Sequence, residues 1–153
     1  IDWSVNAGLR GEFDGWDLDL SYGLGHNHLD QWARNTVNAS LGAASPTSFY
    51  VGRSAFNQQV VEFTGSKNFG AALGMESLNI AFGVQWRRDN FVVSRGDPAS
   101  YAIGPLTVSG KTPATNGRPG FAPEDENDLS RSNIGAFVDV EADVTDRLLL
   151  TAA

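Results

Sequence analysis

Two long stretches of alternating hydrophobic and polar residues meet at Asp14-Gly15, near the start of the chain. Residues 1–13 lead up to this dipeptide, and residues 16–28 lead away from it. Alternation with a period of two is typical of a strand with two different faces, and Asp-Gly between two such stretches predicts a hairpin with a tight type I′ turn. Each arm exceeds the usual soluble strand of about 5–6 residues. Each reaches the about 9–11 residues that a tilted membrane-spanning strand needs.

Further alternating segments follow the hairpin. We expect strands at 58–68, 77–93, 130–143 and 147–153. Two long polar stretches, 29–57 and 95–129, are expected to be irregular loops. No segment shows the 3.6-residue periodicity of an amphipathic helix. The pattern therefore predicts an all-β fold, an antiparallel meander of about six long strands in a single domain that spans residues 1–153.

The expected connections alternate in length along the chain. Short connections are expected at 14–15, 70–76 and 144–146, and the two long loops lie between them. Neighbouring antiparallel strands reverse at opposite ends of a sheet, so we expect the short connections at one end and the long loops at the other. Outer-membrane barrels have this arrangement, with short periplasmic turns and long extracellular loops.

The two alternating series of side chains predict two different surroundings. The apolar series, which we expect to contact lipid, carries Leu18, Leu20, Ile80, Phe82, Val84, Ile134 and Val138, with Trp3, Phe13, Trp16 and Trp86 at positions suited to aromatic girdles. An Arg that faced lipid near the midplane would cost about 2–4 kcal/mol, so the polar series is expected to face a lumen. The lumen-facing candidates are Arg10, Asp17, Asp19, Gln85, Arg87 and Asp139.

Composition excludes several other classes of protein. The chain is 41% hydrophobic with a mean hydropathy of −0.23, and it has no run of about 18 apolar residues that would form a helical span. A net charge of −7 without a Lys/Arg cluster argues against a nucleic-acid partner.

The chain also lacks a recognisable chemical site. There is no Cys, and His26 and His28 would need distant carboxylates to bind a metal, so no metal site is expected. Nothing in the sequence orders Ser, His and Asp residues into a catalytic triad. We therefore expect neither enzymatic activity nor a cofactor.

Several strand motifs carry a resemblance to a known family. Gly-Trp-Asp-Leu-Asp-Leu-Ser-Tyr-Gly at 15–23, Asn-Ala-Ser-Leu-Gly at 38–42 and Leu-Asn-Ile-Ala-Phe-Gly-Val-Gln-Trp-Arg-Arg-Asp at 78–89 resemble segments of TonB-dependent outer-membrane receptors. Gly-Asp-Pro-Ala-Ser-Tyr at 96–101 and Val-Thr-Asp-Arg-Leu at 144–148 are similar too. The resemblance is strongest over 1–30 and 76–153, and it indicates a family rather than a particular solute.

The resemblance implies part of a transmembrane β-barrel of about 22 strands in the bacterial outer membrane. Members of this family bind and import a scarce solute, such as a ferric chelate, cobalamin or a saccharide, with energy from the inner membrane. The implied partners are outer-membrane lipid, a plug domain, the remaining barrel strands, a small-molecule solute and the energy-coupling protein TonB. We expect this chain to be a piece of such a receptor, with the plug and the segment that TonB grips outside it.

Contacts with a solute are expected mainly in the long loops, where aromatic rings near Arg side chains would suit an anionic chelate or a sugar. The candidates are Trp32, Arg34, Phe49, Tyr50, Arg53, Tyr101 and Arg118. Most lumen-facing residues are expected to contact the plug or water instead. The alternative is a soluble all-β module that binds a carbohydrate or another ligand through aromatic platforms, which the size and the low mean hydropathy permit.

Overall fold

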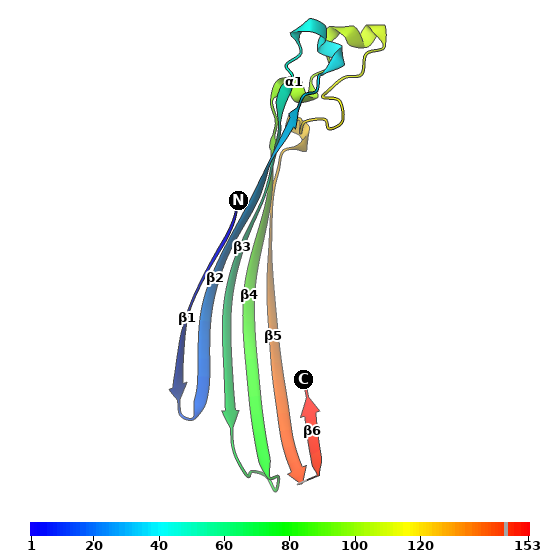
Figure 1. The fold of residues 1–153 in the computed structure, drawn as a ribbon. Coiled ribbons are helices and arrows are strands. Elements are labelled where there is room, and N and C mark those ends of the chain that lie inside the picture. Colours follow the sequence, from blue (N-terminus) through cyan, green and yellow to red (C-terminus); the bar gives the residue numbers. More distant parts are fainter. Residues whose placement is uncertain (146) are drawn as a thin grey trace. The chain divides into compact units, whose positions relative to one another are not determined.

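The computed structural model describes residues 1–145 and 147–153 and contains one antiparallel sheet of six strands. The strands follow one another across the sheet in chain order (Figure 1). They are β1 (Asp2–Phe13), β2 (Trp16–Arg34), β3 (Ser48–Asn68), β4 (Ser77–Arg95), β5 (Asn127–Thr145) and β6 (Leu148–Ala152). The all-β antiparallel meander that the alternation predicts is confirmed.

The residues divide into two compact units, each of which is described by itself. Unit 1 comprises Ile1–Trp3, His26–Asn57 and Asn90–Ser130, and unit 2 comprises Ser4–Gly25, Gln58–Asp89 and Arg131–Ala153. Both long loops belong to unit 1, whereas the turn at 14–15 and the connection at 69–76 belong to unit 2. This grouping agrees with the predicted separation of long from short connections. The turn predicted at 144–146 includes Asp146, which lies outside the described residues.

The hairpin of β1 and β2 has the predicted turn. Asp14 and Gly15 have φ values of 49° and 72°, the left-handed conformation that both central positions of a type I′ turn require. Counting back from this turn places Arg10 opposite Asp19, and Arg10 Nε donates a hydrogen bond of 3.0 Å to Asp19 Oδ2. The two faces of the hairpin therefore stay in phase with the sequence pattern.

Unit 2 has one apolar and one polar face. On the apolar face, the ring of Phe82 lies 5.5 Å from that of Trp16 and 5.8 Å from that of Phe63. On the polar face, Gln85 Nε2 donates a hydrogen bond of 2.7 Å to Glu62 Oε2. Neighbours such as Glu62 and Phe63 thus point to opposite sides, as the period of a strand requires.

Phe137 is the apolar exception on the polar face, and a glycine makes room for it. A Cβ on Gly83, on the neighbouring strand, would lie only 2.2 Å from a carbon of the Phe137 ring. The ring therefore covers backbone that has no side chain of its own, a pairing that stabilises glycine in strands.

The apolar face of unit 2 is open to its surroundings. Its exposed fractions are 46% for Val84, 59% for Val138 and 77% for Ile134. Among the described hydrophobic residues of this unit, only Leu78 and Ala142 are buried. Because a sheet needs a second layer or another partner to bury its apolar side, unit 2 leaves this face for a partner to cover.

The first long loop is much shorter than predicted. β2 continues to Arg34 and β3 begins at Ser48, so the irregular segment is 35–47 rather than 29–57. The prediction was wrong because polar side chains at the end of β2 pair across the strands, where Arg53 contacts Asp30. Such polar pairs stabilise a sheet without producing hydrophobic alternation. The second loop, 96–126, lies within its predicted range of 95–129, because β5 begins three residues earlier than expected.

Short helices occupy the loops of unit 1, although no helix was predicted from periodicity. They are η1 (Ala39–Ala44), α1 (Pro98–Tyr101), η2 (Pro105–Ser109) and η3 (Pro123–Asp125) (Figure 1). The last three begin with proline, whose fixed φ suits the first position of a helix, and all are too short to show a period. In the part of the chain that the structure describes, no helix has the length and apolar character needed to cross a membrane.

Buried hydrogen bonds of Asn38 join the two loops of unit 1. Its Nδ2 donates to the carbonyls of Ala99 and Ala102, each over 2.9 Å, and its Oδ1 accepts from Ser40 Oγ over 2.6 Å. Ser40 Oγ in turn accepts a bond of 2.8 Å from the amide of Gly104. Since Asn38 and Ser40 are fully buried, the loops form a packed structure rather than two independent segments.

We predict that Asn38→Ala loosens the loops of unit 1 and leaves the strands of unit 2 intact. The substitution removes both donors to buried carbonyls and the acceptor of Ser40, and an unsatisfied buried group costs about 1–3 kcal/mol. Hydrogen exchange should become faster at the amide of Gly104, while strand amides of unit 2 keep their protection. Asn116→Ala, at an exposed position of the same unit, is the matched control. Unchanged exchange at Gly104 would contradict the role of Asn38.

Candidate ligand-binding site

Four of the residues predicted to contact a solute lie together in unit 1. Trp32 and Arg34 belong to β2, and Tyr50 and Arg53 belong to β3, so these four are strand residues rather than the loop residues that were predicted. A shallow depression of about 360 Å³ is lined by Asp30, Trp32, Tyr50, Arg53 and Asp97. The structure thus assembles one surface site from the ends of two adjacent strands and the start of the second loop.

Tyr50 and Arg53 lie three residues apart in β3, yet both bond to Asp30 of β2. In a regular strand, positions three apart point to opposite faces. The backbone between them therefore departs from regular alternation. Gly52, which lies between them, has a φ of 130°, and a Cβ there would lie 2.6 Å from neighbouring atoms. This position therefore requires glycine.

Asp30 is the centre of the hydrogen bonding at the site. Arg53 donates to both of its carboxylate oxygens, from Nε over 2.7 Å and from a terminal nitrogen over 2.9 Å. The Tyr50 hydroxyl donates to Oδ1 over 2.9 Å. A bidentate Arg–carboxylate pair is stronger and more directional than a single hydrogen bond. Asp30 therefore fixes the orientation of both neighbouring side chains.

These contacts change the titration of the groups involved. The hydrogen bond from Arg53 holds the pKa of Asp30 below its usual value, and the bond from Tyr50 acts in the same direction. Burial raises the pKa of the Tyr50 hydroxyl, and its hydrogen bond to Asp30 raises it further. Burial lowers the pKa of His28, with a further contribution from the positive charge of Arg53. At neutral pH the Asp30–Arg53 pair is therefore ionised and His28 is neutral.

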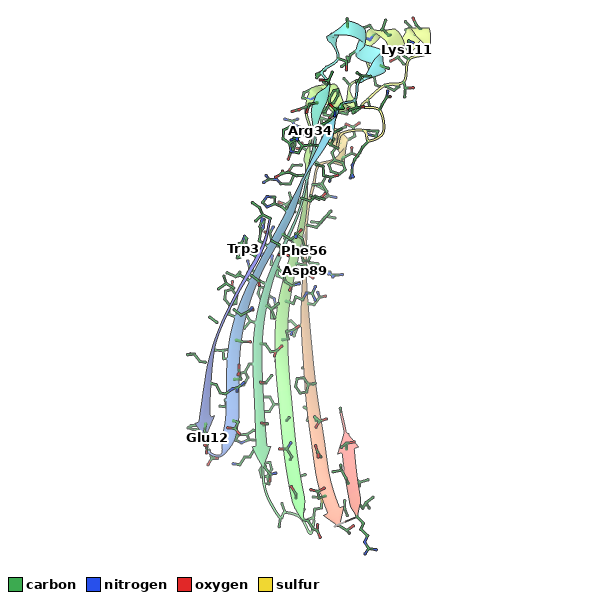
Figure 2. All side chains as sticks on the ribbon, in the orientation of Figure 1. Trp3, Glu12, Arg34, Phe56, Asp89 and Lys111 are labelled. Carbon is green, nitrogen blue, oxygen red and sulfur yellow. The ribbon has the colours of Figure 1, made fainter. Side chains whose placement is uncertain are left out.

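An aromatic surface lies beside this ion pair. Trp32 is 56% exposed, and the guanidinium carbon of Arg34, labelled in Figure 2, lies 5.8 Å from the centre of its ring. A guanidinium held near an aromatic face is attracted by the ring. Together the ring offers an apolar platform and Arg34 offers donors, which suits a sugar or an anionic group.

The other three predicted contact residues are not part of this depression. Phe49 is fully buried in the core of unit 1. Tyr101 is the last residue of α1, and Arg118 is an exposed residue of the loop 96–126.

Sequence reasoning missed the two acidic residues of the site. Asp97 Oδ2 accepts a hydrogen bond of 2.9 Å from the amide of Tyr50, which joins the second loop to β3. The signal in the sequence was an Asp directly before a Pro, a pattern typical of a helix start. Asp30 was missed because the stretch around it was taken as a loop.

Residues predicted to face a lumen lie on the polar face of unit 2. Arg10 pairs with Asp19 at 2.9 Å, Gln85 bonds to Glu62, and Arg87 Nε donates to Asp89 over 2.9 Å. The two remaining candidates, Asp17 and Asp139, occupy the same alternating series, with Asp17 exposed and Asp139 half-buried. These contacts are consistent with one polar face, and its exposure to a lumen stays a prediction.

His26 and His28 contact each other, and His28 Nε2 also lies 3.5 Å from Asp30 Oδ2. His26 Nε2 lies 2.9 Å from His28 Nδ1, and His26 Nδ1 lies 2.6 Å from Asn57 Oδ1. Within residues 1–145 and 147–153, no group of at least three His, Cys, Asp or Glu side chains is placed to hold a metal ion.

Comparison with protein-family models, with curated proteins and with solved structures finds no match.

We predict that Arg53→Gln raises the pKa of Asp30 toward 3.8, its unperturbed value. Because the folded-state pKa is depressed, the pair stabilises the fold above the unfolded pKa, and this contribution is lost as the pH falls through the folded pKa. A carboxyl-carbon NMR titration of the folded protein measures the midpoint directly.

The matched control for this titration is Arg34→Gln. It removes the same charge from a residue that lies over Trp32, so the midpoint of Asp30 should stay nearly unchanged. Equal midpoints in the Arg53→Gln variant and the unmodified protein would show that the bidentate pair does not control Asp30.

Proposed function

We propose that this chain forms part of the β-barrel of a TonB-dependent outer-membrane receptor, which binds and imports a scarce solute such as a ferric chelate, cobalamin or a saccharide. The observation that carries the proposal is the exposed apolar face of unit 2 opposite a polar face on the same sheet. In the receptor, outer-membrane lipid covers the apolar face, and the polar face lines a lumen that contains the plug. TonB and the remaining barrel strands are then required partners.

The height of the apolar series fits a bilayer. On β4 this series runs from Leu78 to Trp86, which matches the about 9–11 residues of a tilted membrane-spanning strand. Near the turns of unit 2, Lys67 lies 5.9 Å from the Trp16 ring and 5.5 Å from the Phe69 ring, and it donates to the carbonyl of Asp14. Lys beside aromatic rings is typical of the interface between lipid and water.

A row of polar side chains crosses four strands of unit 1. His26 contacts Asn57 at 2.6 Å, Asn57 Nδ2 donates to Asn90 Oδ1 over 3.0 Å, and Asn90 Nδ2 donates to Ser130 Oγ over 3.1 Å. On β2, His26 follows Leu24 in the same alternating series. Polar side chains that bond to one another in this way suit a part of the wall that contacts water rather than hydrocarbon.

A soluble binding module is the second candidate. The exposed Trp32 ring beside Tyr50 and Arg34 favours it, because such a platform can stack on a sugar. The open apolar face of unit 2 opposes it, since soluble monomers seldom expose a large contiguous apolar patch.

In the intact receptor, we predict that Val84→Arg weakens folding into membranes by about 2–4 kcal/mol, because the new charge would face lipid near the midplane. Gln85→Arg introduces the same side chain one position along β4, on the polar face with Glu62. Its loss should be much smaller. A membrane-folding titration compares the two, and equal losses would contradict the assignment of the faces.

The size of the isolated chain in detergent-free buffer separates the two candidates. β1 and β6 are the edges of the sheet, where unpaired backbone groups template further pairing. The receptor proposal therefore predicts association or aggregation, with ordered behaviour restored by detergent. A monodisperse, cooperatively melting monomer would reject the receptor proposal and support the soluble module.

A further inference from the structure

A buried carboxylate on the polar face of unit 2 holds two arginines. Asp89 is only 5% exposed. It accepts hydrogen bonds of 2.9 Å from Arg87 Nε, 3.0 Å from Gln58 Nε2 and 3.4 Å from a terminal nitrogen of Arg131. These donors come from three adjacent strands, β3, β4 and β5, and Figure 2 labels Asp89 on the sheet. The cluster therefore depends on the strand register rather than on a local motif.

The cluster carries an excess of positive charge and unused donors. One carboxylate faces two guanidinium groups, and each guanidinium has five N–H donors. Arg87 uses its Nε and Arg131 uses one terminal nitrogen to bind Asp89. The side chain of Arg87 is 42% exposed and that of Arg131 is 72% exposed. Among the described contacts, most N–H donors of Arg87 and Arg131 are therefore available to a partner on the polar face.

Asp89 also restricts the orientation of both arginines. A guanidinium recognises a carboxylate or a phosphate through parallel hydrogen bonds, so its orientation matters as much as its charge. Fixing a flexible side chain before binding reduces the entropy lost on association. Asp89 is therefore a positioning residue, whereas Arg87 and Arg131 present the donors.

The rest of the polar face has the opposite sign. Arg10 is already paired with Asp19. The acidic residues of this face include Glu12, Asp17, Asp19, Glu62, Asp139 and Glu141. Carboxylates repel an anion, and a pair of arginines attracts it. An oxyanion that reaches this face is therefore directed to Arg87 and Arg131.

We propose that Arg87 and Arg131, positioned by Asp89, bind an oxyanion group, carboxylate or phosphate, of the imported solute. The inference rests on the proposed function only in taking the polar face as the path of the solute. It narrows the solute class to anionic molecules that carry a carboxylate or a phosphate group.

Calorimetric titration of the full-length protein in detergent, with citrate and with inorganic phosphate as separate probes, tests this site. At least one probe should bind saturably, and Arg87→Gln and Arg131→Gln should each weaken its affinity by about tenfold or more. The matched control is Arg88→Gln, which removes the same charge from the next residue of β4, on the opposite face. That variant should keep the affinity of the unmodified protein.

Asp89→Asn separates positioning from simple charge. The substitution makes the cluster more positive, so a purely electrostatic site would bind the probe more tightly. Loss of the anchor should instead weaken binding, and Asp89→Glu should restore part of the affinity. Circular dichroism of each variant verifies that the strands have formed.

Two results would overturn the site: no saturable binding of either probe, or affinities that Arg87→Gln and Arg131→Gln leave unchanged. A carboxylate of the plug that already occupies the arginines would give the first result. Fractionation of the natural protein tests the proposed function separately. Absence from the outer membrane would reject the receptor, while binding that depends on Arg87 and Arg131 would still support the site.

Discussion

A single antiparallel sheet satisfies its backbone hydrogen bonds between neighbouring strands, but it cannot bury either of its own faces. Unit 2 shows the consequence, because Ile134 and Val138 stay open on one side while Glu62 and Gln85 bond to each other on the other side. The edge strands, β1 and β6, also have unpaired backbone groups that can pair with further strands. In the wall of a membrane barrel, one face contacts lipid, the other face contacts a polar lumen, and each edge pairs with another strand.

Unit 1 meets the same constraint differently, because its loops supply a small core. Phe49 and Val51 are fully buried, and the buried amide of Asn38 bonds to backbone carbonyls of the second loop. Hydrogen bonds hold these loops together where apolar contacts are few. A packed pair of loops presents a surface of defined shape before it binds. Long disordered segments would lose conformational entropy on adopting such a shape. Recognition by these loops is therefore compatible with the order that the structure shows.

The period of two was sufficient to predict the strands whose faces differ in polarity, and Asp14-Gly15 was sufficient to predict the first turn. The period of two failed to predict the strands within 29–57, where strand pairing depends on polar contacts such as Asp30 with Arg53. The site around Asp30 further depends on the unusual φ of Gly52, which lies between Tyr50 and Arg53. The cluster at Asp89 needs the register of three strands at once. Such juxtapositions are tertiary, and no local pattern encodes them.

The placement of basic residues within the apolar series bears on the choice between the two candidate functions. In unit 2 this series contains Lys67 near the turns and Arg88 directly beyond Trp86, and the positions between them on β3 and β4 are uncharged. In a bilayer the cost of such a charge is depth-dependent, about 2–4 kcal/mol at the midplane and about 0–1 near the interfaces. A lipid-facing wall therefore tolerates basic residues at its two borders and excludes them from the centre. A soluble sandwich excludes charges from its core as well, but it would cover Val84 and Ile134 with a second layer of its own. In unit 2 the apolar face is exposed, and its basic residues lie only at its two borders. Both features fit a membrane wall, so the receptor is the stronger proposal.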